Sequence, residues 1–258
     1  MKRDIELELA RAISEGKKRE KGLEDRKIRA HVFDKSTLLA IRKLQDRGDI
    51  GEIGRVIATG KEANVYYATT PLGSPIAVKI YKLETSSFHS MKKYILGDQR
   101  FEKIKPTRRN IVYTWCQKEY RNLQRAEDAN VRVPTPIAAR KNVLVMELIG
   151  SINNAAPPLV NIGTDNVKKL YKTLIEYVAR LLYIAELVHG DLSEYNILMD
   201  NDTPVLIDMG QSVTRNSLLA QELLDRDLGN IQRFINKMGL NIDIEDVKRD
   251  IRAYEGKL

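Results

Sequence analysis

The chain has 258 residues and a net charge of +8, and 43% of its residues are hydrophobic while 30% are charged, a balance that excludes a disordered polymer. Its longest apolar runs, such as Val143–Ile149, are far shorter than the ~20 residues of a membrane span, and its charged N-terminus is unlike a signal peptide. A single cysteine, Cys116, excludes an internal disulfide, so we expect a cytoplasmic protein without a membrane partner.

The first 50 residues are expected to form a helical extension. Residues 4–29 carry apolar side chains among dense mixed charges, which predicts a helix with one modest apolar face. The following run DKSTLLAIRKLQDRG predicts a second helix, which begins at a capping residue, Asp34 or Ser36, and ends at Gly48.

From Gly51 the hydrophobic pattern becomes strand-like. The runs GEIGRVIATG, ANVYYATT and SPIAVKIY are rich in β-branched residues and predict three consecutive antiparallel strands. Residues 84–107 show no sustained period and are expected to form a loop, either mobile or functional. A long helix is predicted over Arg108–Asn130, and two short strands follow it.

The second half of the chain is expected to be mostly helical. A proline-rich link, NNAAPPLVNIG, divides the chain after its helical extension, residues 1–50, into a first lobe, residues 51–150, and a second lobe, residues 151–258. A cleft between two lobes is where a ligand usually binds. The helices predicted in the second lobe cover Thr164–Leu187, about Ser217–Lys237, and Ile244–Tyr254.

The segment IATGKEANV, residues 57–65, has features of a phosphate-binding turn between two strands. Ala58, Gly60 and Ala63 are small where a backbone would approach phosphates, and Val65 matches the valine of the kinase pattern G-x-G-x-x-G-x-V. Because only one glycine of that pattern is kept, an ordinary hairpin stays open as an alternative.

Lys79 lies in the middle of the apolar strand AVKIY, 14 residues after Val65. An ammonium there is costly to bury unless phosphate oxygens and a carboxylate accompany it. Glu119 is the candidate partner, because it shares a helix face with Trp115 and Leu123. The alternatives are an edge-strand lysine with its tip in solvent and a solvated glutamate.

The stretch VHGDLSEYNILMDNDTPVLIDMGQ predicts a catalytic loop followed by a hairpin. Asn196 comes five residues after Asp191, and Asp208 ends the second strand of the hairpin. Phosphoryl transfer needs a base that orients the acceptor and ligands for the metal on the nucleotide phosphates. We therefore expect Asp191 to be the base and Asp208 to bind metal, whereas Asp200 is expected to be a turn residue and His189 a structural one.

Together these residues resemble the RIO family of atypical protein kinases, most closely its type-1 subfamily. The motifs that carry the resemblance are TGKEANVY (Thr59–Tyr66), AVKIY with Lys79, MELIG (Met146–Gly150), HGDLSEYNIL (His189–Leu198) and LIDMGQSV (Leu206–Val213).

The resemblance implies an α+β, two-lobed protein-kinase-like fold, with an antiparallel sheet and one long helix in the first lobe and a mostly helical second lobe. It implies an ATP-dependent serine kinase that phosphorylates itself and uses Mg²⁺ or Mn²⁺. Asp191 would accept the proton, Asn196 and Asp208 would hold the metal, and Asp208 would also be a transient phosphoryl acceptor. The nucleotide-binding residues implied are Thr59, Gly60, Lys61, Glu62, Val65, Lys79, Glu119 and, through backbone groups of a hinge, Glu147 and Ile149.

The resemblance also implies work in maturation of the small ribosomal subunit, so ATP and the pre-ribosomal small subunit are the expected partners, and DNA is not. Gly190 stands where most protein kinases have an arginine that anchors a phosphorylated segment, and Met209 stands where most have phenylalanine. No A-P-E signature follows. We therefore expect neither a phosphorylation switch nor a peptide-docking activation segment.

Other functions use the same residues. An ATPase switch on a pre-ribosomal particle would differ from a serine/threonine kinase only in whether water or a side chain accepts the phosphoryl group. A small-molecule kinase of the aminoglycoside or choline type also shows HGDL…N before ID, but it usually has a larger helical substrate pocket. An RNA-binding module without catalysis would not need the intact set of catalytic residues.

Overall fold

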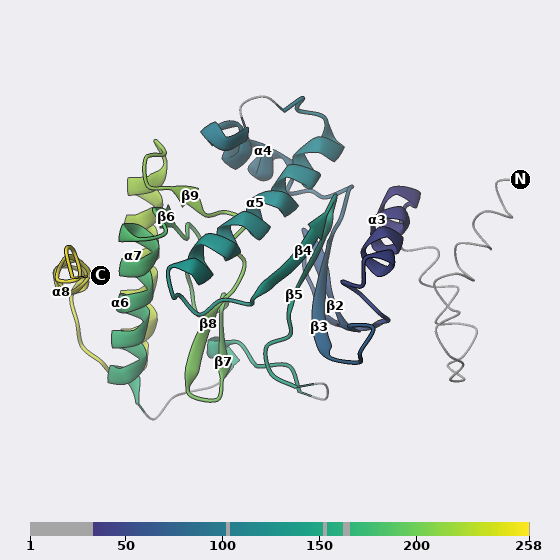
Figure 1. Cartoon of the computed structure of the whole chain (residues 1–258). Coiled ribbons are helices and arrows are strands. Elements are labelled where there is room, and N and C mark those ends of the chain that lie inside the picture. The colour runs from purple at the N-terminus through teal and green to yellow at the C-terminus, as the bar shows by residue number, and fades with distance from the viewer. Residues whose placement is uncertain (1–32, 102–103, 152–153, 162–165, 258) are drawn as a thin grey trace, which may run out of the picture.

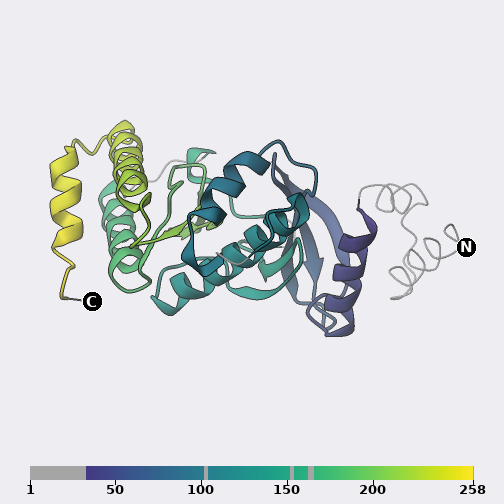
Figure 2. The same cartoon turned by 90° about the horizontal axis from the view of Figure 1, so that it is seen from above.

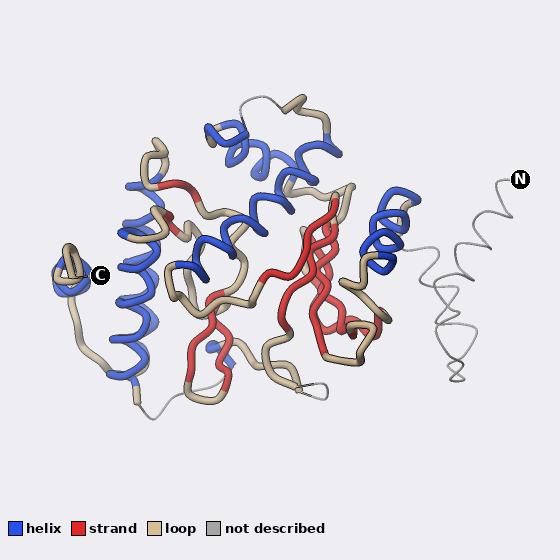
Figure 3. The backbone as a smooth tube through the Cα atoms, in the orientation of Figure 1, coloured by secondary structure: helices blue, strands red, loops and turns tan. Residues whose placement is uncertain are grey.

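The structure is a computed structural model, which describes residues 33–101, 104–151, 154–161 and 166–257. The helix predicted over residues 4–29 lies outside the described residues. In the described part, a sheet with helices on it stands beside a mainly helical half, as the red and blue segments of Figure 3 show. The division of the chain at residue 150 stays a prediction.

Five strands form one antiparallel sheet in the order β1-β2-β3-β5-β4. The central strand β3 is buried at six of its seven residues, which explains why its sequence reads as a continuous apolar run. The three consecutive strands predicted from the sequence are confirmed. The strands are β1 (Ile53–Thr59), β2 (Ala63–Thr69), β3 (Pro75–Tyr81), β4 (Pro136–Arg140) and β5 (Val143–Glu147).

One face of this sheet is covered by α3 (Lys35–Asp46), the second predicted helix (Figures 1 and 2). Asp34 caps it, since its Oδ1 accepts hydrogen bonds from two backbone N–H groups of the first turn. Ile41 and Leu44 pack in one buried cluster with Val78 of β3. The outer face of the sheet therefore has its own small hydrophobic core.

The long helix α5 (Arg108–Asp128) lies against the opposite face and runs between the two halves of the molecule (Figure 1). Thr107 caps it by accepting a hydrogen bond from the N–H of Asn110. Its buried residue Trp115 belongs to a large cluster that continues into the helices of the second half. The helix thus contacts both halves and can carry residues to a site between them.

The segment before α5 differs from the expectation of a loop over residues 84–107. It contains the helix α4 (Phe88–Leu96) and a short 3₁₀ turn, η1 (Gln99–Phe101). Met91 and Ile95 of α4 are fully buried in the main cluster. These two residues lie four apart and therefore on one side of the helix. The apolar stripe is only two turns long and has lysines beside it, which explains why the sequence pattern did not predict a helix here.

The described residues of the second half form three α-helices, two short strand pairs and one 3₁₀ turn. The predicted hairpin is confirmed, with Leu198 opposite Val205, although Asp200 is the last residue of its first strand rather than a turn residue. The predicted helix over Thr164–Leu187 ends at Tyr183, because Leu187 pairs with Thr214 in a two-stranded sheet. The elements are η2 (Leu159–Asn161), α6 (Val167–Tyr183), β6 (Leu187–Val188), β7 (Ile197–Asp200), β8 (Thr203–Leu206), β9 (Val213–Thr214), α7 (Ala220–Lys237) and α8 (Ile244–Arg252).

Residues 209–219, which include β9, connect Asp208 to α7. A connection this short leaves no room for a long segment that docks a peptide, as the sequence predicts. Across the described ranges, no helix combines the length and the apolar character that a membrane crossing requires.

Candidate active site

Lys79, on β3, lies at the centre of the candidate site and contacts two carboxylates. Its Nζ is 2.8 Å from Oε1 and 3.0 Å from Oε2 of Glu119 on α5, and 3.1 Å from Oδ1 of Asp208. The ion pair between Lys79 and Glu119 that the sequence predicts is therefore formed. The side chain of Glu119 is 1% exposed and that of Asp208 is 40% exposed, so Asp208 is the carboxylate that a ligand can reach.

The two carboxylates keep Lys79 charged. Burial alone would lower the pKa of Lys79, but Asp208 and then Glu119 raise this pKa above its ordinary value. Burial would likewise raise the pKa of Asp208, but the ammonium of Lys79 lowers it. In Glu119 burial has the larger effect and raises the pKa. An ionised Asp208 beside a charged lysine suits the binding of a metal and phosphates.

Asp208 adopts a left-handed backbone conformation, with φ at 63°. Such a conformation is uncommon for a residue with a side chain, and besides turns it is found at functional sites. The N–H of the preceding residue, Ile207, donates to the carbonyl oxygen of Asn196 at 3.0 Å. The hairpin β7–β8 therefore brings the two residues predicted to bind metal, Asn196 and Asp208, side by side.

Asp191 lies in the loop before β7, where two amides hold its carboxylate. The Nδ2 of Asn196 donates to Oδ2 of Asp191 at 3.3 Å and to its carbonyl oxygen at 2.8 Å. The Nε2 of Gln211 donates to the same Oδ2 at 3.0 Å. Burial and, next, the negative charge of Asp208 raise the pKa of Asp191. The carboxylate is thus oriented and more basic than usual, as a proton acceptor requires.

His189 has the structural role that the sequence predicts. Its Nε2 donates to the carbonyl oxygen of Ile207 at 3.1 Å, and its Nδ1 accepts from the N–H of Asp191 at 3.3 Å. His189 is 2% exposed, and burial lowers its pKa to about 4. A neutral His189 therefore ties the loop of Asp191 to the strand end that carries Asp208.

Asp227, on α7, supports the same loop, a role that was not predicted from the sequence. Its Oδ2 accepts from the N–H of Gly190 at 2.7 Å, and its Oδ1 accepts from the N–H of Leu192 at 2.9 Å. The Nδ2 of Asn230 donates to the carbonyl oxygen of Leu192 at 2.8 Å. The signal was present, because an acid lies on the apolar stripe of α7, as Glu119 does on α5.

The backbone conformation and the close surroundings of Gly190 explain why this position lacks the arginine that most protein kinases have. Its φ is 78°, and a Cβ would meet the carbonyl oxygen of Gln211 at 3.2 Å and Leu223 at 3.3 Å. A left-handed residue in such tight surroundings favours glycine. The loop therefore turns closely against the segment after Asp208.

The predicted phosphate-binding turn joins β1 to β2. The N–H of Gly60 donates to the carbonyl oxygen of Ala63 at 2.9 Å, and Nζ of Lys82 donates to the carbonyl oxygen of Gly60 at 2.6 Å. Thr59, Gly60 and Lys61 are exposed. The turn is thus tied down from the side of β3, and its tip is open to a ligand.

Val65 and Glu62 extend from this turn toward the centre of the site. Val65 lies opposite Lys79 in the register of β2 and β3. Glu62 is half-buried, and burial followed by the charge of Asp208 raises its pKa. The structure therefore brings the turn, the strand lysine and Asp208 to one place, while the nucleotide-binding role of each residue stays a prediction.

The predicted hinge follows β5. The side chain of Glu147 is turned away to Arg132, with two contacts of 2.6 Å, and its N–H donates to Thr135. The carbonyl oxygen of Ile149 accepts from the N–H of Ala156. The N–H of Glu147 and the carbonyl of Ile149 are therefore already engaged within the fold, and the adenine contacts of these two residues stay a prediction.

The donor set fits a divalent metal only together with phosphates. Among the described residues there is no group of three or more His, Cys, Asp or Glu side chains that could hold an ion. Asp208 and Asn196 offer one carboxylate and one amide oxygen, since both bonds of Asn196 to Asp191 use Nδ2. Mg²⁺ is commonly bound by one or two protein oxygens plus water and substrate phosphates, which is what this pair can provide.

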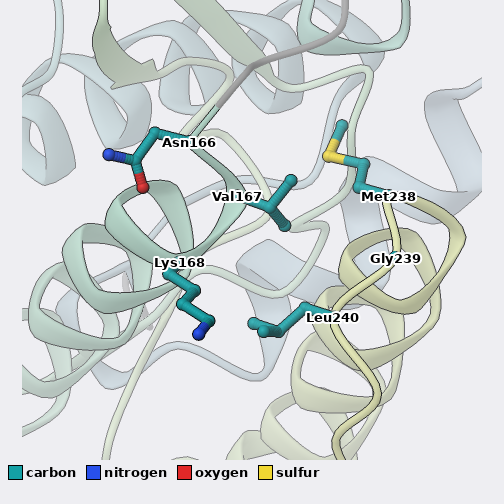
Figure 4. Close-up of a pocket in the computed structure, with 6 residues that line it drawn as sticks. All are labelled: Asn166, Val167, Lys168, Met238, Gly239 and Leu240. Carbon is teal, nitrogen blue, oxygen red and sulfur yellow. The ribbon is translucent and has the colours of Figure 1, made fainter.

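A hollow of about 260 Å³ lies elsewhere, where α6 begins and α7 ends (Figure 4). It contains none of the predicted site residues. The loop that carries Asp191 follows the other end of α6, and a helix of 17 residues is about 25 Å long. This hollow is therefore separate from the candidate active site. Its lining residues are Asn166, Val167, Lys168, Met238, Gly239 and Leu240.

Three features together define a protein-kinase-like protein. They are the antiparallel sheet with a long helix against it, the helical second half, and the site around Lys79, Glu119, Asp191 and Asp208. A family model described as the RIO domain matches residues 64–248. The RIO-type serine/threonine-protein kinase Rio1 of Haloferax volcanii is 41% identical over 96% of this chain and 85% of its own length. That of Methanocaldococcus jannaschii is 40% identical over 92% of this chain and 81% of its own length.

The chain belongs to the RIO family of protein kinases, in its type-1 subfamily. By family it is a serine/threonine kinase, a transferase, rather than a small-molecule kinase. Serine/threonine-protein kinase RIO1 of Homo sapiens is 40% identical over 81% of this chain but only 38% of its own length.

Solved structures agree with the fold. A complex of the Rio2 kinase from Chaetomium thermophilum with ADP/Mg²⁺ and phosphoaspartate matches with a TM-score of 0.64, at 23% identity over 83% of this chain and 66% of that one. The Rio2 kinase from the same organism also matches, with a TM-score of 0.63 over 83% of this chain and 67% of that one. The predicted α+β, two-lobed protein-kinase-like fold is therefore confirmed.

Proposed function

We propose that this chain transfers the γ-phosphoryl group of ATP to serine hydroxyls, including its own. The observation that carries the proposal is the position of Lys79 between Glu119 and Asp208, beside a base, Asp191, whose carboxylate is held by two amides. Phosphoryl transfer depends mainly on positioning and on charge stabilisation, so a rigid set of this kind is what the reaction needs.

Each residue has a defined task in this reaction. Lys79 would bind phosphate oxygens, since Glu119 holds its ammonium charged and in place. Asp191 would accept the proton of the acceptor hydroxyl, for which a raised pKa is an advantage. Asp208 and Asn196 would hold Mg²⁺ or Mn²⁺, which neutralises charge on the phosphates.

ATP hydrolysis through Asp208 is a second candidate function. It is favoured by the phosphoaspartate in the related Rio2 kinase structure and by the open carboxylate of Asp208. A carboxylate oxygen would attack the γ-phosphorus while the bond to ADP breaks. Water or a serine hydroxyl would then take the phosphoryl group from Asp208, which gives hydrolysis or transfer respectively.

We further propose the pre-ribosomal small subunit as the partner and the cytoplasm as the place of action. The supporting observations are family membership and the net charge of +8, which favours association with RNA-rich particles. A metal-bound nucleotide and an RNA surface would both be attracted by this charge.

Incubation with γ-labelled ATP, alone and with small-subunit precursors, tests these proposals. Label on serine, stable to hydroxylamine, indicates transfer to serine, whereas hydroxylamine-labile label with release of phosphate indicates hydrolysis through Asp208. Asp191→Ala should reduce transfer by roughly 10²-fold or more and leave ATP binding intact. Asp202→Ala, at the exposed tip of the β7–β8 hairpin, is the matched control. Near wild-type transfer by Asp191→Ala would show that Asp191 is not the base.

A further inference from the structure

Lys118, on α5 beside Glu119, is a buried lysine that the proposed reaction does not use. The residue has no exposed surface. Its Nζ donates to the carbonyl oxygen of Gly210 at 2.7 Å and to that of Ser212. Although burial lowers the pKa of Lys118 to about 7, a neutral amine still has two N–H donors for these two bonds. A polar group is costly to bury unless it has hydrogen-bond partners. Both partners of the Lys118 amine are backbone carbonyl oxygens of the segment after Asp208.

Asn122, one turn further along α5, contacts the same segment. Its Nδ2 donates to the carbonyl oxygen of Met209 at 2.8 Å and to that of Ser212 at 3.2 Å. Like Lys118, Asn122 has no exposed surface. Two side chains of one helix thus donate to three backbone carbonyls within four residues of the chain.

The amide of Asn122 is held in this orientation by a residue of η1. The Nη1 of Arg100 donates to Oδ1 of Asn122 at 2.9 Å. Arg100 is itself fixed by Asp98, with Nε to Oδ1 at 2.9 Å and Nη2 to Oδ2 at 2.6 Å. With its oxygen engaged by Arg100, the amide can only direct its N–H groups toward the segment after Asp208.

The same face of α5 packs directly on this segment through Trp115. A Cβ on Gly210 would lie 2.8 Å from Nε1 of Trp115 and 2.9 Å from Cε2, so the backbone approaches the ring more closely than any side chain would permit. Trp115, Lys118 and Asn122 lie three and four residues apart and therefore share one side of the helix. They form a continuous support for residues 209–212.

We propose that Lys118 and Asn122 are positioning residues that fix residues 209–212 against α5 and so hold Asp208 in its metal-binding position. This inference rests on the proposed role of Asp208. Helix α5 then acts on Asp208 from two sides. Glu119 orients Lys79 against the carboxylate of Asp208. Lys118 and Asn122 hold the backbone that follows Asp208. The uncommon backbone conformation of Asp208 is retained because the next residues cannot shift.

The test measures how nucleotide binding depends on metal in Lys118→Met and Asn122→Leu, which keep the approximate side-chain volumes and remove the N–H donors. The Mg²⁺ concentration for half-maximal binding of a fluorescent ATP analogue should rise about tenfold to hundredfold, the usual effect of losing a group that orients a metal ligand. Binding without metal should change little. In the protein without nucleotide or metal, backbone amides of residues 209–212 should exchange with deuterium faster.

Asn142→Leu is the matched control, because Asn142 is also a buried asparagine whose amide donates to a backbone carbonyl. Its Nδ2 contacts Thr37 at 2.8 Å and the carbonyl oxygen of Tyr81 at 2.9 Å, on the side of the sheet that α3 covers. This variant should lose stability without a change in metal dependence. Arg100→Gln, at a partly exposed position, should shift metal dependence in the same direction as Asn122→Leu, and it serves if the buried variants do not fold.

Folded variants of Lys118, Asn122 and Arg100 with wild-type metal dependence and wild-type deuterium exchange would overturn the inference and leave the proposed function intact. If the wild-type protein binds the analogue equally with and without metal, the role of Asp208 itself is wrong. The two failures are therefore distinguished by the wild-type titration.

Discussion

Gln211, in the segment that follows Asp208, holds the carboxylate of Asp191, with Nε2 3.0 Å from Oδ2. Asn196 contacts the same oxygen from the loop of Asp191 itself. Because Gln211 comes three residues after Asp208, the proposed base, Asp191, and the proposed metal ligand, Asp208, are linked through one side chain. Their relative position is therefore part of the fold and does not depend on a bound ligand.

Gln211→Leu should lower kcat and leave the KM for ATP nearly unchanged. The variant removes one hydrogen bond to a charged group, worth about 1.5–3 kcal/mol, so a loss of about tenfold or more in kcat is expected. Steady-state kinetics with labelled ATP measures both constants. The control is Gln124→Leu, on the exposed side of α5, which should behave as wild type. Equal kcat in the two variants would show that Gln211 does not orient the base.

Substitutions at Lys79 and Glu119 should change stability and activity in different ways. Glu119→Leu leaves Lys79 without its buried partner, and breaking such a pair costs about 3–5 kcal/mol of unfolding free energy. In the double variant Lys79→Met with Glu119→Leu, much of this loss should be recovered, because the ammonium that lost its buried partner is removed as well and only the contact to the more exposed Asp208 is given up. Activity should be lost in both. Chemical denaturation measures the unfolding free energies of the single and the double variant. If the double variant regains none of the lost stability, the contact to Asp208 alone is enough to stabilise the charge of Lys79.

Asp208→Asn should remove the effect of Mg²⁺ or Mn²⁺ on ATP binding. The amide keeps the shape of the side chain but loses the charge that attracts a divalent ion. Titration calorimetry with and without metal measures the difference. Asp200→Asn, at the far end of the same hairpin, should retain the wild-type response. A metal response that persists in Asp208→Asn would place the ion elsewhere.

His189 should make the protein less stable in acid. Burial lowers its pKa from 6.5 to about 4, so between these values the unfolded chain binds a proton that the folded chain does not. The unfolding free energy therefore falls as pH falls across this range, by up to about 3 kcal/mol at 1.36 kcal/mol per pKa unit. His189→Gln should show a weaker fall in denaturant titrations. His89→Gln, at an exposed position on α4, should keep the wild-type dependence.

Much of the site could be predicted because its residues are close in sequence or lie in simple patterns. The spacing of Asp191, Asn196 and Asp208 follows from one loop and one hairpin, and each feature has a local signal. Lys79 and Glu119 are distant in sequence, but a charge on an apolar strand and a charge on an apolar helix face each indicate a buried partner.

Residues whose partners are backbone atoms far along the chain could not be predicted. Lys118 and Asn122 contact carbonyls about 90 residues later, and a carbonyl has no sequence signature. The helix α4 was missed for a different reason. Its stripe is short, and whether Met91 and Ile95 become buried depends on α5, against which α4 packs.

The cover that α3 gives to the sheet has a practical consequence for shortening the chain. A protein cut at Gly51, where the strand-like pattern begins, would lose Ile41 and Leu44 and leave Val78 and its neighbours open to water. An uncovered apolar sheet face favours self-association. A soluble truncation should therefore retain Asp34, whose carboxylate starts the helix.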